Sequence, residues 1–263
     1  MLVDSLAENA QIFLLILARV VAIVQIAPLL SSASIPQIAK IGLAFFASLL
    51  VFPWVVELGY PIPGTGLEFA GLLIGELLIG VIIAFMLVVI YSAFLIAGQF
   101  FSLQMGFGAS EVFDPLAQIQ IPLMGQFLNI IAMFTFIVVG GFQKIFLVGI
   151  YRSFQAAKAY DFIAHKDYIL SFMIRSLGSL FEQALLIAFP ILGTLMLVSV
   201  TMGLLAKAAP QMNMLMLGFP IAILVAFTVL FLTLPFLIEG FEKVIDESFV
   251  SILTLLDRVK GGP

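Results

Sequence analysis

The chain has 263 residues, of which 63% are hydrophobic and only 10% charged, with a mean hydropathy of +1.26. Because a soluble domain carries about 25% charged residues, this composition excludes a soluble globular protein and predicts a membrane protein. A net charge of −4 without a basic tract excludes nucleic acid as a partner, and a single histidine with no cysteine leaves no expected metal or cofactor site.

Six apolar segments approach or exceed the about 20 residues that a membrane-spanning helix needs. In chain order they are Ala10–Leu30, Ile41–Val56, Phe69–Ala97, Ile121–Val139, Leu180–Leu205 and Met214–Ile238. Prolines punctuate the first two connections, where a fixed φ and a missing N–H end helices: Pro28, Pro36, Pro53, Pro61 and Pro63. The predicted fold class is an all-α membrane protein with about six long apolar helices.

Three charged residues, Arg19, Glu76 and Glu182, lie inside apolar segments. Charges at membrane depth are costly and usually face protein or water. Three interpretations fit them. Arg19 pairs with one of the two glutamates as a structural lock, or one glutamate carries protons, or both glutamates face neighbouring subunits. The sequence does not choose among the three.

The stretch Leu103–Pro115 interrupts the apolar sequence with two glycines, two acids, a proline and two phenylalanines. Irregular backbone cannot face lipid, because unpaired N–H and C=O groups there cost several kcal/mol each, roughly. The stretch must therefore leave the membrane, be buried in protein, or line a water-filled cavity. The whole sequence contains no HExxH, GxSxG or P-loop motif, so we expect no enzyme activity.

The last two apolar segments are joined by Pro210-Gln211-Met212-Asn213. Proline and asparagine suit a tight connection between antiparallel helices. If the six segments are simple spans, the distribution of Lys and Arg places both chain ends in the cytoplasm and this turn on the opposite side.

The tail from Glu239 is amphipathic. Its apolar residues recur at helical spacing and its charged residues lie off that stripe, which consists of Phe241, Ile245, Phe249, Ile252 and Leu256. Either the stripe packs on its own protein, or it is a docking surface for another subunit.

Three stretches carry a resemblance to a known family. They are Gln104-Met105-Gly106-Phe107-Gly108 with Asp114-Pro115, then Pro210-Gln211-Met212-Asn213, and the hairpin from Ala188-Phe189-Pro190 to Leu234-Pro235. Over essentially the whole chain, the sequence resembles the FliR/SpaR/YscT family of type III secretion export-gate proteins. The resemblance implies stacked helical hairpins in one packed unit. An N-terminal FliP-like part would span 1–178, with a pore-facing loop at 103–122, and a FliQ-like hairpin with the amphipathic tail would span 179–263.

The function implied by the resemblance is that of a flagellar export-gate subunit in the bacterial inner membrane, within the basal body and with part of the assembly above the membrane plane. One copy would join FliP and FliQ, near FlhB and FlhA, around a channel for unfolded flagellar proteins. The implied pore plug is Met105, Gly106, Phe107, Gly108, Phe113, Asp114 and Pro115. Glycines allow positive φ, and phenylalanine and methionine supply deformable apolar surface that excludes water.

The resemblance also places Pro210, Gln211, Met212 and Asn213 at the cytoplasmic entrance of the channel, opposite to the side given by the charge distribution. It gives Arg19, Glu76 and Glu182 a role in assembly. Two other function classes remain: a polytopic ion channel or secondary transporter for small solutes, and a non-conducting membrane assembly scaffold. A transporter usually shows broken helices repeated in two halves, and the sequence has no convincing inverted repeat.

Overall fold

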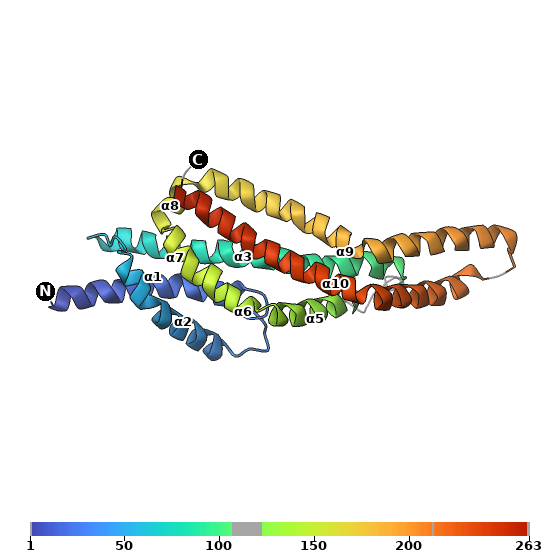
Figure 1. The fold of residues 1–263 in the computed structure, drawn as a ribbon, viewed down its shortest axis with the longest axis horizontal. Helices are drawn as coiled ribbons and strands as arrows, with labels where there is room; N and C mark the ends of the chain where they lie inside the picture. Colours follow the sequence, from blue (N-terminus) through green and yellow to red (C-terminus); the bar gives the residue numbers. More distant parts are fainter. Residues whose placement is uncertain (1, 107–122, 212, 262–263) are drawn as a thin grey trace. The chain divides into compact units, whose positions relative to one another are not determined.

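The computed structural model describes residues 2–106, 123–211 and 213–261 (Figure 1). This described part is helical and contains no strand, which confirms the all-α class. The long helices are α1 (Leu2–Ile26), α2 (Gln37–Glu57), α3 (Gly66–Gln104), α5 (Leu123–Val138), α9 (Lys166–Ala208) and α10 (Met214–Gly261). Between α5 and α9 lie the shorter α6 (Gly141–Lys144), the π-helix η1 (Ile145–Arg152), α7 (Ser153–Ala156) and α8 (Ala159–Ala164).

Five of the described helices are long and apolar enough to cross a membrane, and a bent pair makes a sixth candidate. The bent pair is Leu123–Val138 with Gly141–Ala156, which meet at 68°. The bend lies at Gly140, whose φ of +74° suits glycine and ends the α5 helix. The predicted number of about six apolar helices is therefore confirmed.

Three helices extend well beyond the apolar segments that predicted them. α3, α9 and α10 contain 39, 43 and 48 residues. The apolar pattern marks only part of each helix, and the amphipathic tail continues α10 because its apolar stripe packs on the protein.

The chain forms two compact units. The first comprises Met1–Ile90, Gly140–Leu177 and Ile245–Pro263, and the second comprises Tyr91–Val139 and Gly178–Val244. α3, α9 and α10 each contribute residues to both units. These units follow spatial packing and do not coincide with the predicted parts 1–178 and 179–263, which remain a prediction from resemblance.

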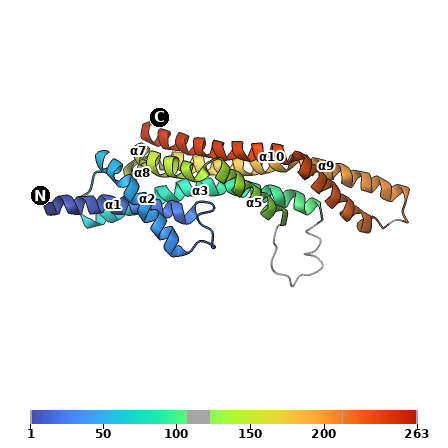
Figure 2. The same cartoon turned by 60° about the horizontal axis from the view of Figure 1, so that its bottom comes forward.

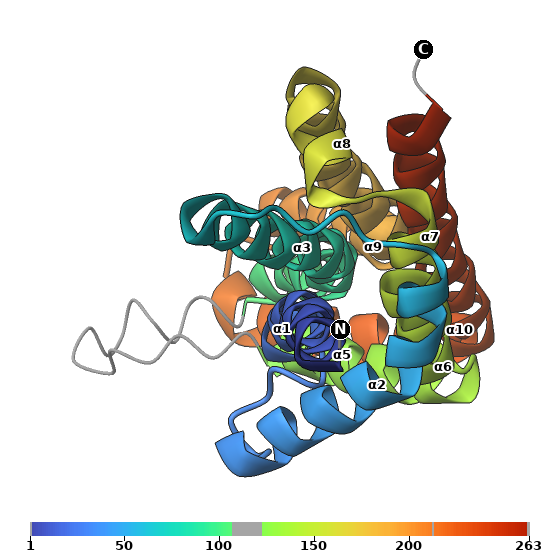
Figure 3. The same cartoon turned by 90° about the vertical axis from the view of Figure 1, so that its left-hand side faces the viewer.

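In the first unit α1 packs against α2, and η1 contacts both helices (Figure 3). The buried side of α1 carries Ile12, Ile16, Val20 and Ile23 at helical spacing. The tail completes this core, with Ile245, Phe249, Ile252 and Leu256 at most 4% exposed. An ion pair between Lys144 and Asp246 ties the tail to α6. The stripe of the amphipathic tail thus packs on its own protein, as the first interpretation expected.

In the second unit the end of α3, α5 and the hairpin of α9 and α10 lie together. The two hairpin helices run in opposite directions, with α9 ending at Ala208 and α10 beginning at Met214 (Figures 1 and 2). The rings of Phe94 and Phe241 lie 4.5 Å apart between centroids, which joins α3 to α10. α3 and α5 approach closely where Gly98 meets Gly125, since a Cβ added at Gly98 would overlap the Gly125 backbone.

Candidate functional site: a buried Arg19–Glu76 cluster

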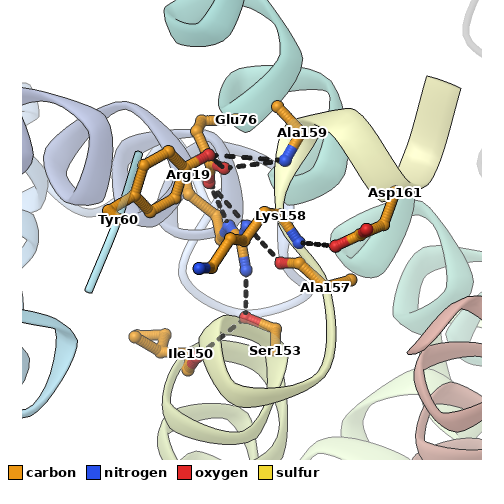
Figure 4. Close-up of polar contacts among 9 residues, drawn as sticks. All are labelled: Arg19, Tyr60, Glu76, Ile150, Ser153, Ala157, Lys158, Ala159 and Asp161. Carbon is orange, nitrogen blue, oxygen red and sulfur yellow. Dashed lines mark hydrogen bonds and ion pairs between the residues drawn. The ribbon is translucent and has the colours of Figure 1, made fainter. Parts of the chain in front are cut away.

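Arg19 on α1 and Glu76 on α3 form an ion pair in the first unit (Figure 4). The guanidinium Nε donates to Glu76 Oε2 at 2.6 Å, and Nη2 lies 2.6 Å from the same oxygen. Both side chains are 0% exposed. Burying two charges costs several kcal/mol each, by rough estimate, unless the geometry and the surrounding hydrogen bonds compensate. The remaining contacts of this pair supply that compensation.

The rest of the guanidinium is bound by the end of the η1–α7 segment. Nη1 donates to Ser153 Oγ at 3.0 Å, and Nη2 donates to the Ala157 carbonyl at 2.9 Å. Ala157 has an extended backbone with φ −150°, so its carbonyl has left the helical hydrogen-bond pattern. An arginine at the C-terminal end of a helix donates hydrogen bonds to such carbonyls, and its positive charge interacts favourably with the negative end of the helix dipole. The Phe154 ring centroid lies 3.9 Å from Arg19 Cζ and completes the pocket.

The second carboxylate oxygen of Glu76 is also occupied. Oε1 accepts a hydrogen bond from the Tyr60 hydroxyl and another from the Ala159 N–H, the latter at 3.2 Å. Ala159 begins α8, so the carboxylate satisfies a helix N-terminal donor. Burial, with the negative charge of Glu76 beside it, raises the pKa of the Tyr60 phenol well above its ordinary value of 10.0. Tyr60 therefore remains a protonated donor to the carboxylate.

The cluster has no open side for a substrate. Among the described residues, every buried side-chain nitrogen and oxygen has a hydrogen-bond partner. The positive and negative charges cancel, and the bound groups connect α1, α3, α7, α8 and the connection that contains Tyr60. This arrangement is that of a structural lock, and it matches the interpretation in which Arg19 pairs with a glutamate.

Small residues allow the backbones around the pair to approach. A Cβ added at Gly80, one turn after Glu76, would overlap the Arg19 carbonyl oxygen and lie 2.8 Å from Ala22 Cβ. A Cβ at Gly75 would lie 2.7 Å from Ala159 Cβ, whereas nothing lies within 4 Å of one at Gly71. Gly71 and Gly75 have the GxxxG spacing that lets helices approach, but only Gly75 packs closely, and α1 meets α3 at Gly80.

Glu182 does not join this cluster, and its expected role in assembly stays a prediction. It lies on an exposed side of α9. The buried side of that helix carries Leu180, Ala184, Ala188, Ile191 and Leu195. Glu182 follows Leu180 by two residues, which on a helix turns it away from the buried stripe. Within the described residues Glu182 makes no hydrogen bond or ion pair.

Only the first residues of the predicted plug are described. Met105 is 1% exposed, and Gly106 has φ +86° and lies against Phe219 of α10. Phe107, Gly108, Phe113, Asp114 and Pro115 lie outside the described residues.

At the predicted entrance loop, Pro210, Gln211 and Asn213 are exposed, and Met212 is outside the described residues. The Asn213 side-chain oxygen accepts from the Met216 N–H at 3.4 Å, at the start of α10.

Sequence reasoning missed Tyr60 and Ser153, and it missed the backbone groups of Ala157 and Ala159. Backbone groups carry no residue-type signal, and Ser153 is one of several serines in polar surroundings. Tyr60 offered the only usable signal, since a tyrosine buried next to a membrane helix needs a partner for its hydroxyl. In the described part of the chain, no group of three or more His, Cys, Asp or Glu residues could hold a metal ion.

Comparisons with known proteins bear on the whole chain. The family model of bacterial export proteins, family 1, matches residues 10–248. The chain is similar to the flagellar biosynthetic protein FliR of Borreliella burgdorferi, at 32% identity over 228 residues, 84% of this chain and 84% of that protein. It is similar to FliR of Bacillus subtilis, at 27% identity over 97% of this chain and 98% of that protein. FliR of Escherichia coli is 25% identical over 92% of each chain.

Proposed function

The chain belongs to the bacterial export proteins of family 1, and we propose that it lines and plugs the channel of a flagellar type III protein export gate. Family membership makes it a membrane component of flagellar biosynthesis and export, and not an enzyme. The channel-lining role, the plug and the identity of the neighbouring subunits go beyond membership and are the content of the proposal.

The observation that carries the proposal is the amount of apolar helix surface that the chain leaves uncovered. α9 and α10 contain 43 and 48 residues, about twice what one crossing needs. In their most apolar windows, only 22% and 17% of the residues are buried. Exposed apolar side chains extend along α9 from Leu170 to Leu205, a longer stretch than the about 20 residues that lipid covers, so part of this surface requires protein neighbours. We propose that FliP and FliQ are these neighbours, in a gate that holds one copy of this chain.

The plug is proposed for Met105, Gly106, Phe107, Gly108, Phe113, Asp114 and Pro115. Of the two described residues, Gly106 supports the proposal, because its φ of +86° redirects the backbone, whereas Met105 is buried within the protein. The loop of Pro210, Gln211, Met212 and Asn213 is proposed as the entrance, near FlhB and FlhA. Unfolded flagellar proteins are the proposed cargo, and the inner membrane at the flagellar basal body is the proposed location.

The Arg19–Glu76 pair argues against the alternative of a proton-coupled transporter. A proton-carrying glutamate needs a route to water and a reason to change charge during the cycle. Glu76 is fully buried, faces a guanidinium at 2.6 Å and accepts two further hydrogen bonds. We propose that the pair holds the helices of the first unit in place for assembly. Glu182, which is exposed, is the better candidate for contact with a neighbouring subunit.

The composition of the native complex tests the proposal. The protein would be expressed with its neighbouring genes, extracted in mild detergent and weighed by native mass spectrometry. One copy bound to several copies of two other small membrane proteins would support the gate. A monomer or homodimer, under conditions in which another membrane complex from the same cells stays intact, would favour the transporter. An assembled complex that conducts no ions after removal of the plug would favour the non-conducting scaffold.

A further inference from the structure

The helix α2 leaves most of its apolar surface uncovered within the first unit. Only 28% of its most apolar window is buried, against 44% for α1. We propose that the outward side of α2 contacts membrane lipid, and that Trp54 lies where this surface reaches the lipid headgroups. The inference goes beyond the proposed gate, because it requires a membrane around the chain but no channel.

The buried side of α2 carries the residues that let another helix approach. It consists of Lys40, Ala44, Ser48, Val51 and Val55, at helical spacing. α1 packs against α2 (Figure 3). Ala44 and Ser48 are 1% and 0% exposed, and small residues four positions apart allow close helix contact in a membrane. The Ser48 hydroxyl donates to the Ala44 carbonyl at 2.7 Å, so it needs no partner from another element.

The outward side of α2 has the opposite character. Its large apolar side chains are 43% to 86% exposed and include Ile38, Ile41, Phe46, Leu49, Leu50 and Trp54. No two small residues lie four positions apart on this side. On α9, by contrast, the exposed Gly178 and Glu182 have this spacing, and a small residue beside a charge suits a protein neighbour. Lipid is therefore the partner that fits α2.

The length of α2 also matches a single membrane crossing. The helix has 21 residues, and a crossing needs about 20. Its charged residues lie near its ends, at Lys40 and Glu57, and no charge lies between them. Lys40 Nζ donates to the Ser31 carbonyl at 2.9 Å, which holds the cation at the N-terminal end. Lipid can thus cover the whole uncharged stretch of α2, which is not so for the longer α9.

The C-terminal end of α2 carries groups that are typical of a membrane–water interface. The rings of Trp54 and Tyr151 meet edge to face, with centroids 4.9 Å apart. Trp54 is 43% exposed, and Arg152, which follows Tyr151 on η1, is also exposed. Tryptophan and tyrosine are enriched at the headgroup level because their rings are amphipathic. This end of α2 therefore belongs at the headgroups, and the middle of the helix belongs in the hydrocarbon.

The test uses Trp54 as a reporter, because it is the one tryptophan of the chain. The complete complex, expressed with the neighbouring genes, is placed in phosphatidylcholine vesicles with bromine either near the headgroup or near the end of the acyl chains. Bromine quenches tryptophan emission on contact, and a Trp54→Phe complex supplies the emission of the neighbouring subunits for subtraction. Phe46→Trp in the Trp54→Phe background reports on the middle of α2, about 12 Å along the axis from Trp54.

The matched control is Tyr160→Trp in the same background. Tyr160 is 48% exposed but lies on α8, outside the candidate membrane spans. Native mass spectrometry of each variant checks assembly separately. If it finds the chain alone, the gate fails, while quenching of the purified full-length chain still decides the present inference.

We expect Trp54 to lose more emission with bromine near the headgroup, and Phe46→Trp to lose more with bromine near the chain end. Tyr160→Trp should lose none with bromine near the chain end. The inference is overturned if bromine at neither depth quenches Trp54 or Phe46→Trp, because a neighbouring subunit or water would then cover α2. Equal quenching of both positions at both depths would also overturn it, because α2 would not cross the hydrocarbon.

Discussion

Arg19 and Glu76 are 57 positions apart in sequence, yet their side chains meet at 2.6 Å with no exposure to solvent. The pair connects the first and third long helices at the level where the chain after α7 turns back into α8. A neutral, fully hydrogen-bonded pair of this kind fixes the register of helices that apolar packing alone would leave free to slide.

Removing one partner of the pair should therefore be far more costly than removing both. Glu76→Gln leaves the buried guanidinium without its counter-charge, and we expect a loss of about 3–5 kcal/mol of folding stability. The double variant Arg19→Met with Glu76→Gln should recover part of this loss. Thermal unfolding of the purified protein in detergent measures both. Equal melting temperatures for Glu76→Gln and the original protein would contradict the structural lock.

Tyr60 should contribute stability that depends on pH. Its phenol donates to Glu76, and its pKa lies above the ordinary value of 10.0. The folded state therefore keeps the proton while the unfolded chain loses it, so this contribution is fully present below about pH 10 and declines above it. Tyr60→Phe should lower stability by about 1–3 kcal/mol at neutral pH. The difference between the two proteins should shrink in unfolding curves recorded above pH 10, and a constant difference would refute the assignment.

The close approach of α1 and α3 gives a paired glycine test. Gly80→Ala places a Cβ against the Arg19 carbonyl, so α1 must move away and the ion pair must stretch. Gly71→Ala, on the same helix, meets nothing within 4 Å and should gain about 0.4–1 kcal/mol from the lower chain entropy of alanine. Denaturation in detergent compares the two. The packing argument requires Gly80→Ala to be the less stable variant.

Much of this fold follows from the length of the apolar segments and from the prolines between them, as the recovery of all six predicted segments shows. The same reasoning does not distinguish the two glutamates. Glu76 and Glu182 both sit in apolar segments, but only Glu76 is buried. In a soluble helix the polar face identifies the exposed side, whereas a membrane helix is apolar all round and gives no such mark. The partner choice of Arg19 therefore depended on three-dimensional packing, since Gly80 lets α1 approach α3.

The residue types in the sequence also did not identify the outer contacts of the cluster. Ser153 and Tyr60 come from segments 93 positions apart, and the carbonyl of Ala157 has no signature in sequence. The amphipathic tail was more informative, because its regular apolar stripe predicts that these side chains are buried, and they are buried in the first unit. A periodic pattern predicts burial, but it does not say which element provides it.

Glu182 should behave unlike Glu76 in two separate assays. Because Glu182 is exposed and the described residues supply no partner for it, Glu182→Gln should change the stability of the isolated protein by no more than about 0.5 kcal/mol. If a neighbouring subunit contacts this side of α9, the same variant should reduce the yield of the native complex. Normal yield together with normal stability would remove Glu182 from the assembly surface.

Deleting Gly106–Asp114 should distinguish a channel plug from a non-conducting scaffold. Gly106 lies at the end of α3 and the buried core of the second unit is built by α3, α5, α9 and α10, so the deletion removes no core side chain of the described residues. The complex should still assemble, while ions leak and growth slows because the apolar constriction is gone. Ion leak is measured by the loss of membrane potential, and assembly by native mass spectrometry. The control is a replacement of the deleted stretch by glycine and serine of equal length, which preserves loop closure but not apolar surface. If both variants assemble and remain tight, the loop does not seal the channel, because neither its length nor its apolar side chains would then be needed to exclude ions.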